Sequence, residues 1–272
     1  MSDHEDSRPP IDLTADDLTA DDLRAGASPR WRIEVVEETT STNADVAERF
    51  RGGEREGLVL VAEHQTSGRG RLGRQWVTPA RSSLTVSFLL EPGDVSADRW
   101  PWLPLLTGIA AAAAVRRVTG VEVALKWPND VLADGQKLGG ILLERVDRDG
   151  AAAAVVGIGI NCAQTTEELP VPQATSLSIV TGAPVDRTAL LAALIDELAA
   201  RYDEWRSGAD LRPAYLELCR TPGQQVRVAV PSGEVVGEAV DVDESGRLVV
   251  RTEAGEEHLG AGDVVHVRPE RG

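Results

Sequence analysis

The spacing of apolar residues predicts strands and a helix in the segment that starts at Trp31. Three stretches have the alternating or continuously apolar pattern of strands, namely residues 31–38 (WRIEVVEE), 57–63 (GLVLVAE) and 82–90 (SSLTVSFLL). Thr42 starts a sequence like a capping box and Gly52 ends the helical pattern, so we expect a short helix over about 43–51. This segment is therefore expected to mix α and β structure.

The middle of the chain predicts a long helix, a group of paired strands and two further helices. An Ala-rich stretch predicts a helix over about 104–118 that ends at Gly120. The sequence from there to Cys162 indicates a meander of three strands, with turns at Pro128-Asn129-Asp130, Asp134-Gly135 and Asp149-Gly150. Asp186 precedes a helix with a leucine-rich face, and a shorter helix is expected over about 210–219.

The pattern changes near residue 220, which we interpret as a domain boundary. Five short alternating segments follow Pro222, separated by SGE, DESG, EAGE and GAGD. Their spacing of roughly 8 to 12 residues is typical of a small β-barrel. We therefore predict a large domain over residues 31–220 and a small C-terminal β-barrel over 221–272.

Residues 1–30 are predicted to form a disordered acidic tail. They contain the near-repeat DLTADDLTADDLRA and offer little apolar surface to offset the entropy of ordering. The alternative is an acidic amphipathic helix that binds a partner, since Leu13, Leu18 and Leu23 recur at equal spacing. The segment is too short for a helix-turn-helix domain.

Composition narrows the class of protein. The chain has 272 residues with 42% apolar content and a net charge of −16, which fits a globular protein and opposes general nucleic-acid binding. It lacks an apolar run of roughly 18 residues and any visible targeting segment, so we expect a cytoplasmic protein that does not bind membranes. Cys162 and Cys219 are expected to be buried thiols, and the four scattered histidines suggest neither zinc nor a nucleophile system.

The most distinctive stretch is Gly68-Arg69-Gly70-Arg71-Leu72-Gly73-Arg74, which lies between two predicted strands. Its glycines allow unusual backbone angles and its arginines carry fixed positive charge. It matches neither the GxxxxGK[ST] loop nor a GxGxxG turn that opens a helix. A loop held by two strands is a common way to mount a lid, so we expect it to close over an anionic ligand. A solvated loop or a nucleic-acid patch is the alternative.

Other polar residues stand at the ends of predicted elements. Ser41, Thr42 and Asn43 either cap the following helix or present hydroxyl and amide groups to a neutral polar ligand. Gln65 follows an apolar strand as either a loop residue or a ligand contact. Asn161 ends the strand GIGI, whose glycines leave room for a flat or bulky ligand.

The sequences KWPND and KLGG place charges beside tight turns. Lys126 and Lys137 flank these turns, and a surface lysine is usually solvated. The paired glycines Gly139 and Gly140 instead suggest close approach of a backbone or a ligand, so Lys137 is a candidate contact for a carboxylate or phosphate. Asp130 is either a turn residue or a ligand of Mg²⁺, which prefers one or two carboxylates plus substrate phosphates.

These motifs together closely resemble the biotin protein ligases, over about residues 33–268. The resemblance rests on STN before a helix, AEHQTSGRGRLGRQW, KWPNDVL…KLGGILLE and GIGINC. It implies an α+β fold in which helices flank a mixed or antiparallel central sheet, as in class II aminoacyl-tRNA synthetases, followed by the small β-barrel. It also implies a ligase that forms biotinyl-5′-AMP from biotin and MgATP. Biotin then passes to a lysine of a biotin carboxyl carrier protein, as in acetyl-CoA carboxylase.

The resemblance also implies a role for individual residues. Biotin contacts are implied for Ser41, Thr42, Asn43, Gln65, Arg69, Gly70, Arg71, Lys137, Gly139 and Gly140. Nucleotide contacts are implied for Arg69, Arg71, Arg74, Trp76, Lys126, Asn129, Asp130 and Asn161, with Mg²⁺ at Asp130. The implied catalytic residues are Lys137, Arg69 and Arg71. Attack by a carboxylate on a phosphoryl centre needs positioning and charge neutralisation more than a protein nucleophile, which agrees with these side chains.

Two features depart from the family pattern. Leu72 stands in the loop where many relatives carry another basic residue. The chain also lacks the N-terminal DNA-binding domain that some members use as a biotin-responsive repressor, so it resembles the monofunctional type.

Two other functions are kept as alternatives. One is a lipoate or octanoate ligase or transferase on the same fold, and the other is a non-enzymatic biotin-binding regulatory protein. The Ser/Thr/Asn/Gln set suits a ureido ring better than a flexible acyl chain, and Lys137 and Asp130 argue for catalysis. The sequence leaves open a homodimer and the identity of the carrier protein.

Overall fold

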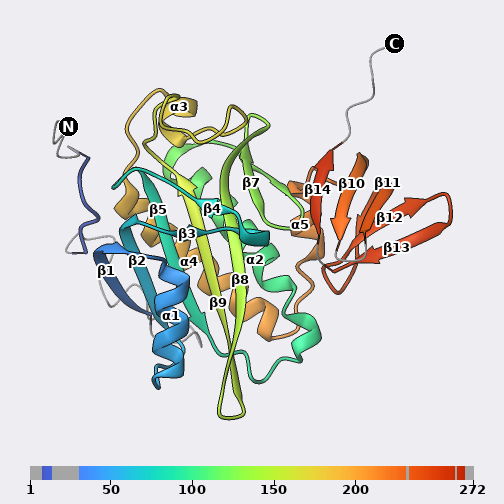
Figure 1. Cartoon of the computed structure of the whole chain (residues 1–272), viewed down its shortest axis with the longest axis horizontal. Helices are drawn as coiled ribbons and strands as arrows, with labels where there is room; N and C mark the ends of the chain where they lie inside the picture. The colour runs from blue at the N-terminus through green and yellow to red at the C-terminus, as the bar shows by residue number, and fades with distance from the viewer. Residues whose placement is uncertain (1–7, 14–30, 231–232, 261, 267–272) are drawn as a thin grey trace.

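The computed structural model describes residues 8–13, 31–230, 233–260 and 262–266, arranged as a large and a small unit (Figure 1). The large unit is built on a seven-stranded sheet. In spatial order its strands are β1 (Arg32–Thr39), β2 (Leu58–Gln65), β5 (Ser83–Leu90), β9 (Ala151–Asn161), β8 (Gln136–Arg148), β7 (Asp130–Ala133) and β6 (Ala124–Lys126). β1 and β2 are parallel and the other described neighbours are antiparallel, so the expected mixed sheet is confirmed.

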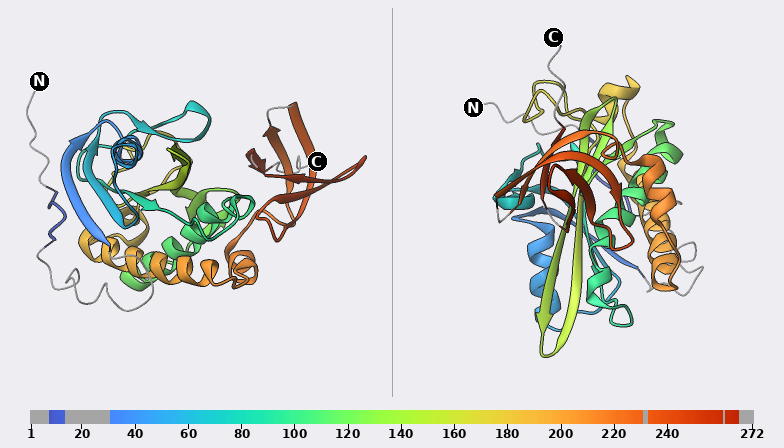
Figure 2. Two further views of the ribbon diagram at one scale, coloured as in Figure 1. Left: turned by 90° about the horizontal axis from the view of Figure 1, so that it is seen from below. Right: turned by 90° about the vertical axis from the view of Figure 1, so that its right-hand side faces the viewer.

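Helices cover the two faces of this sheet differently (Figure 2). α2 (Trp102–Thr119) and α4 (Arg187–Arg206) pack on one face, where the larger part of the apolar core lies. α1 (Thr42–Arg51) packs on the other face, where Val46 and Phe50 join a smaller buried cluster. Near the start of α1, the same face of the sheet carries mainly polar residues and glycines together with Leu142, and the candidate site lies there.

The Gly/Arg stretch forms a short ribbon across this same face. β3 (Gly68–Arg69) and β4 (Gln75–Trp76) pair in antiparallel fashion, and a 3₁₀ turn (Arg71–Gly73) connects them. In Figure 1 this ribbon passes in front of β9 and β8. Residues 68–76 are called the arginine loop below.

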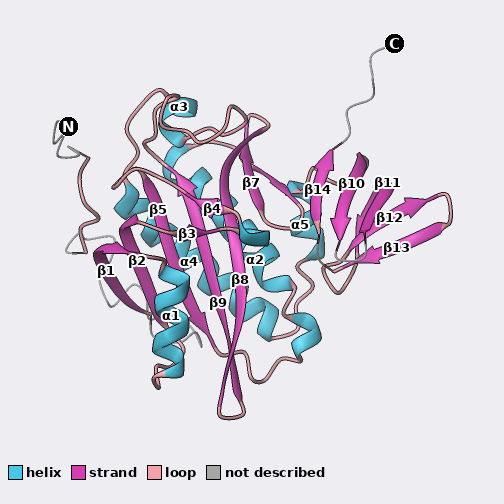
Figure 3. Ribbon diagram, viewed as in Figure 1, coloured by secondary structure: helices cyan, strands magenta, loops and turns pink. Residues whose placement is uncertain are grey.

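The secondary structure differs from the sequence-based expectation at two places (Figure 3). The meander has four strands, β6 to β9, instead of the expected three, because the three expected turns, including that at Pro128-Asn129-Asp130, separate four strands. The short helix α3 (Leu177–Thr181) was not expected. The other expected helices are present, including α5 (Arg212–Leu218) ahead of the small unit.

The C-terminal unit is an open sheet, so the expected closed barrel is wrong. Its strands are β10 (Gln225–Val230), β11 (Gly233–Val242), β12 (Leu248–Thr252), β13 (Gly255–Leu259) and β14 (Asp263–His266). The spatial order β13-β12-β11-β10-β14 leaves β13 and β14 at opposite edges, without pairing between them in the described residues. Strand alternation shows which side chains are buried but not whether the edge strands meet, which a barrel requires.

Two tryptophans of the large unit anchor the small one. The Nε1 of Trp127 donates to the carbonyl of Gly246 at 2.9 Å, and that of Trp102 donates to Glu244 at 2.7 Å. Gly246 has a positive φ of 77°, and a Cβ there would lie 3.0 Å from Leu105, so the contact favours glycine. The small unit is therefore held against the first turn of α2 and the start of the KWPND turn.

Residues 8–13 pack against the large unit, in contrast to the expected disordered tail. Ile11 is buried, and its backbone N–H donates to Oε1 of Glu63 at 2.6 Å. The other oxygen of Glu63 pairs with Arg187 at 2.7 Å, and Arg187 also donates to the carbonyl of Pro9. Hydrogen bonds from its backbone to a buried ion pair hold this segment in place. The number of apolar residues in the segment does not reveal such contacts. The rest of the expected tail lies outside the described residues.

Both cysteines are buried free thiols, as expected, and burial raises the pKa of Cys162 to about 12. Among the helices that the structure describes, none has the length and apolar content needed to cross a membrane.

Candidate active site

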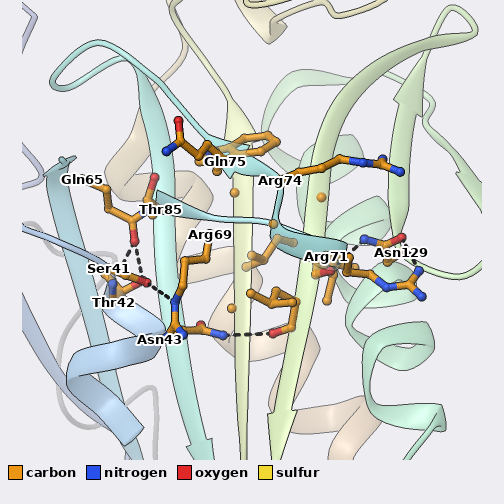
Figure 4. Close-up of a pocket in the computed structure, with 18 of the residues that line it drawn as sticks. Ser41, Thr42, Asn43, Gln65, Arg69, Arg71, Arg74, Gln75, Thr85 and Asn129 are labelled. Atoms are coloured by element: carbon orange, nitrogen blue, oxygen red, sulfur yellow. Dashed lines mark hydrogen bonds between the residues drawn. The ribbon is translucent and has the colours of Figure 1, made fainter. Parts of the chain in front are cut away.

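A pocket lies between the α1 face of the sheet and the arginine loop (Figure 4). The first turn of α1 forms one side, β5, β9 and β8 form the floor, and the KWPND turn forms the other side. Most of the sequence-predicted residues line it: Ser41, Thr42, Asn43, Gln65, Arg69, Gly70, Arg71, Arg74, Trp76, Asn129, Asp130, Lys137 and Gly140. Segments that are distant in the sequence thus meet in one site.

One side of the pocket is a cluster of neutral polar groups. Oε1 of Gln65 accepts hydrogen bonds from the backbone amide of Thr42 at 2.8 Å and from its hydroxyl at 3.1 Å. Ser87, on β5, lies 2.7 Å from the hydroxyl of Thr42 and donates to Oδ1 of Asn43 at 2.6 Å. With Ser41 at the pocket edge, these five residues are called the hydroxyl–amide cluster below.

The start of α1 does not use its serine as a cap. Ser41 occupies the N-cap position with extended backbone angles, yet its side chain accepts no hydrogen bond from the helix. Its hydroxyl instead lies 3.5 Å from Nε of Arg69. The capping interpretation of Ser41 therefore does not hold, and this hydroxyl is available at the pocket.

Ser87 was not predicted as a site residue, although the sequence around it carries a signal. Ser83, Thr85 and Ser87 alternate along β5, so their side chains share the face that carries the pocket. Thr85 lines the pocket, and Ser87 is completely buried at the centre of the hydroxyl–amide cluster. Hydroxyls at every second position of an otherwise apolar strand could have indicated a polar floor.

The arginine loop carries three cations, each with a different partner. Arg69 pairs with Glu144 at 3.1 Å, and Arg71 donates to Oδ1 of Asn129 at 3.0 Å. Arg74 forms an ion pair with Asp263 of the small unit. The loop therefore touches the centre of the sheet, the KWPND turn and the C-terminal unit, so its position depends on all three.

Burial lowers the pKa of Arg71, while Asp263 and Asp130 act in the opposite direction. Its guanidinium is nevertheless charged at neutral pH, because the ordinary pKa of arginine is so high. Positive charge is thus concentrated locally in a protein whose net charge is −16. In a chain with this net charge, an anion should bind where positive charge is concentrated, and the arginine loop provides such a place.

The cationic end of the pocket is completed by Lys137. Its Nζ lies 2.5 Å from Oδ1 of Asp130 on the neighbouring strand. Gly140 faces the same region, and a Cβ there would lie 3.6 Å from this Nζ. In the described residues, no group of three or more His, Cys, Asp or Glu side chains is placed to hold a metal. Asp130 alone fits only a cation that takes further ligands from substrate, as Mg²⁺ does with phosphates.

The glycines of the GIGIN strand make room for protein side chains. A Cβ at Gly157 would come within 2.1 Å of Oδ1 of Asn43, and one at Gly159 within 2.6 Å of the Trp76 ring. Both contacts are too short for any other residue to be tolerated without movement. The glycines therefore let Asn43 and Trp76 lie directly on the sheet, where they form part of the pocket wall.

Three of the predicted site residues lie elsewhere. Asn161 is buried and donates to the carbonyl of Thr175 at 2.9 Å, while Gln164 donates to its Oδ1. Lys126 lies on β6, and Gly139 lies within the sheet against the carbonyl of Gly159. None of the three lines the pocket. Their motifs are next to the site in sequence, but Asn161 lies at the end of β9, where it bonds to the Thr175 loop, and Lys126 and Gly139 also lie outside the pocket lining.

Comparison with known proteins gives the class of this chain, which is that of the protein ligases. Residues 33–161 match the biotin/lipoate A/B protein ligase family, and residues 221–267 match the biotin protein ligase C-terminal domain. The structure is similar to biotin protein ligase from Aquifex aeolicus in complex with biotin and ATP, with a TM-score of 0.76 and 29% identity, covering 88% of this chain and 99% of that one.

Sequence relatives give the narrower family. The chain is 41% identical to the biotin–[acetyl-CoA-carboxylase] ligase of Mycobacterium tuberculosis, over 98% of this chain and 100% of that protein. It is 33% identical to the bifunctional ligase/repressor of Escherichia coli, over 80% of this chain and 68% of that one. The chain belongs to the biotin protein ligase family and is a ligase, as the motifs implied.

Proposed function

We propose that this chain activates biotin with ATP and transfers it to a lysine of a biotin carboxyl carrier domain. One observation carries the proposal: a single pocket has a neutral hydroxyl–amide cluster at one end and Lys137 with the arginine loop at the other. Biotin has the matching polarity, with an uncharged ureido ring at one end and a carboxylate at the other. The similarity to ligases named for biotin supports the same assignment.

The ureido ring would bind at the hydroxyl–amide cluster. This ring offers two N–H donors and one carbonyl acceptor, which hydroxyl and amide groups can match. The cluster is buried, so a head group that can hydrogen-bond to it would gain more there than an apolar group of similar size. This is the specific reason to favour biotin over lipoate or octanoate, whose far ends lack a ureido group.

The carboxylate and the ATP phosphates would meet at the cationic end. Lys137 would neutralise the carboxylate and the α-phosphate, and Arg69 and Arg71 would stabilise the negative charge from the loop. A carboxylate oxygen attacks the α-phosphorus, the bond to pyrophosphate breaks, and biotinyl-5′-AMP remains. Mg²⁺ at Asp130 would supply further neutralisation of phosphate charge when it is bound.

Transfer of biotin to the carrier then requires only that the attacking amine is uncharged and that water is kept out of the site. The carrier lysine attacks the acyl carbon, AMP leaves, and an amide forms as the amine loses its proton. The arginine loop would keep water and other amines away from the mixed anhydride in the meantime. The two buried thiols and the use of ATP fit a cytoplasmic setting, and the acidic chain charge opposes DNA binding.

Ligand-dependent stabilisation and pyrophosphate release test this proposal together. Biotin should raise the melting temperature, because it binds only the native state, whereas lipoate and octanoate at equal concentration should not. Pyrophosphate should appear only when biotin, ATP and Mg²⁺ are all present. Release driven equally well by lipoate would favour the acyl-ligase alternative. Stabilisation by biotin without any pyrophosphate would favour a binding protein.

A further inference from the structure

Glu144 connects two parts of the site that are far apart in sequence. Its Oε2 accepts a hydrogen bond from Nδ2 of Asn43 at 2.8 Å, and its Oε1 lies 3.1 Å from Nη1 of Arg69. Asn43 belongs to the hydroxyl–amide cluster, and Arg69 belongs to the arginine loop. One carboxylate on β8 therefore holds a member of each.

Glu144 does not line the main pocket. It lies with Leu142 in a neighbouring hollow that residues 67–75 also line. Gly140 and Leu142 occupy alternate positions of the same strand and do line the pocket. Glu144 thus continues the pocket-facing row of β8 just beyond the ligand space, so any effect on the reaction must act through its two partners.

The carboxylate fixes which way the amide of Asn43 points. A carboxylate is only an acceptor, so the NH₂ group of Asn43 must face Glu144, and its carbonyl oxygen must face Ser87. The same NH₂ group lies 3.3 Å from the carbonyl of Leu142, which favours the same orientation. A glutamine at position 144 could accept the same bond, whereas an alanine could not.

The contact to Arg69 is of a different kind. The side chains of Arg69 and Glu144 are 44% and 30% exposed, so the ion pair is weak and readily exchanged. Arg69 also lies 3.5 Å from the hydroxyl of Ser41. The pair can hold this arginine at the pocket edge without preventing its movement onto a ligand anion.

We propose that Glu144 is a positioning residue that couples the hydroxyl–amide cluster to the arginine loop. It fixes the orientation of the Asn43 amide within the cluster that would bind the head group, and it holds Arg69 ready to close over the anionic end. This inference rests on the proposed function, because it assumes that one ligand contacts both regions. Loss of the charge at position 144 alone should disturb the loop while leaving head-group binding largely intact.

Limited trypsin digestion of the ligand-free protein tests the contact to Arg69 without any substrate. Trypsin cleaves after arginine, and an exposed ion pair is worth at most about a fivefold change in loop opening. Glu144→Gln should therefore be cut within the arginine loop about two to five times faster than the parent. Asp147→Asn is the matched control, because Asp147 lies on the same strand and pairs with Arg145. Equal cleavage rates in all three proteins would overturn the link to Arg69.

Kinetics separate the two roles of Glu144. Glu144→Gln should keep the KM for biotin within about twofold and release biotinyl-5′-AMP several times faster, whereas Glu144→Ala should also raise the KM. In combination with Arg69→Gln, the Glu144→Gln change should have almost no further effect on release, because both act through one contact. Fully multiplicative effects on release, or a KM that responds equally to Gln and Ala, would refute the coupling.

The digestion also distinguishes this inference from the proposed function. If the parent protein formed no biotinyl-5′-AMP, the proposed function would fail, while the cleavage rates would still show whether Glu144 restrains Arg69. If the parent were active and Glu144→Gln matched it in both cleavage and release, the coupling alone would fail.

Discussion

Nζ of Lys137 on β8 lies 2.5 Å from Oδ1 of Asp130 on β7, so two adjacent antiparallel strands hold a charge pair at the cationic end of the pocket. The same pocket receives the arginine loop from β3 and β4. The reaction depends on the positions of Lys137 and the loop arginines when substrate binds. The first two predictions concern these cations.

Lys137→Ala should slow biotinyl-5′-AMP formation by about ten- to a hundredfold. The change removes a charge-assisted contact worth about 1.5–3 kcal/mol, and each 1.4 kcal/mol corresponds to about tenfold in rate. Its side chain is 34% exposed, so no core cavity is created and the melting temperature should change little. Pyrophosphate release is the measurement, with Arg117→Ala on the outside of α2 as the control. An unchanged rate would remove Lys137 from the mechanism.

Arg71→Gly should make the intermediate leak. Arg71 links the arginine loop to Asn129, so its loss should weaken closure, and about 1.4 kcal/mol corresponds to a complex tenfold weaker. The adenylate should still form but should biotinylate lysines of an unrelated protein, which a blot for biotin detects.

A second loop variant separates charge from flexibility. Leu72 is 70% exposed with a φ of 55°, so Leu72→Gly frees the backbone without removing an arginine. It should leak much less than Arg71→Gly. Equal leakage from both would show that backbone freedom, and not the lost contact, opens the loop.

Removal of residues 1–13 should lower the free energy of unfolding by about 1–3 kcal/mol, the cost of leaving buried polar groups without partners. The N–H of Ile11 and the carbonyl of Pro9 both bond to the Glu63–Arg187 ion pair, which is almost completely buried. Urea unfolding measures the change, and removal of residues 1–7 is the control because it keeps these contacts. Specific activity of the folded enzyme should be nearly unchanged. Identical unfolding curves for both truncations would contradict the role assigned to this segment.

The small unit should lose stability in acid through Asp243. Burial opposes ionisation of this carboxyl, but hydrogen bonds from His258 and Arg247 outweigh it and lower its pKa. Because the folded pKa lies below the unfolded value of about 3.9, the ionised group stabilises the fold above that pH, and the contribution is lost as pH falls through the folded pKa. Asp243→Asn should therefore be less stable near pH 7 and should lose less stability on acidification. Parallel curves of unfolding free energy against pH for both proteins would count against this.

The sequence predicted the parts of the molecule that depend on local pattern. Alternation placed β1, β2 and β5, and motif order correctly grouped Gln65, Arg71 and Lys137 in one pocket. The sequence did not predict features that depend on contacts between residues far apart in the chain. Whether β13 and β14 meet, and whether residues 8–13 pack on Glu63, are decided by tertiary structure.

Side-chain direction was a second source of error. Asn161 belongs to a site motif, but its side chain bonds to the loop at Thr175 instead of entering the pocket. Conversely, Ser87 belongs to no recognised motif, and Glu144 ends the KLGGILLE motif without having been given a role; the strand register brings both beside Asn43. Motif membership therefore identified the neighbourhood of the site more accurately than the individual contacts.

The most direct test is intact-mass spectrometry of a biotin carboxyl carrier domain from acetyl-CoA carboxylase after incubation with this protein. With biotin, ATP and Mg²⁺ present, the account predicts a mass increase of one biotinyl group on a single lysine, and none when biotin or ATP is omitted or lipoate replaces biotin. A carrier domain that stays unmodified with biotin, or is modified equally well by lipoate, would contradict it.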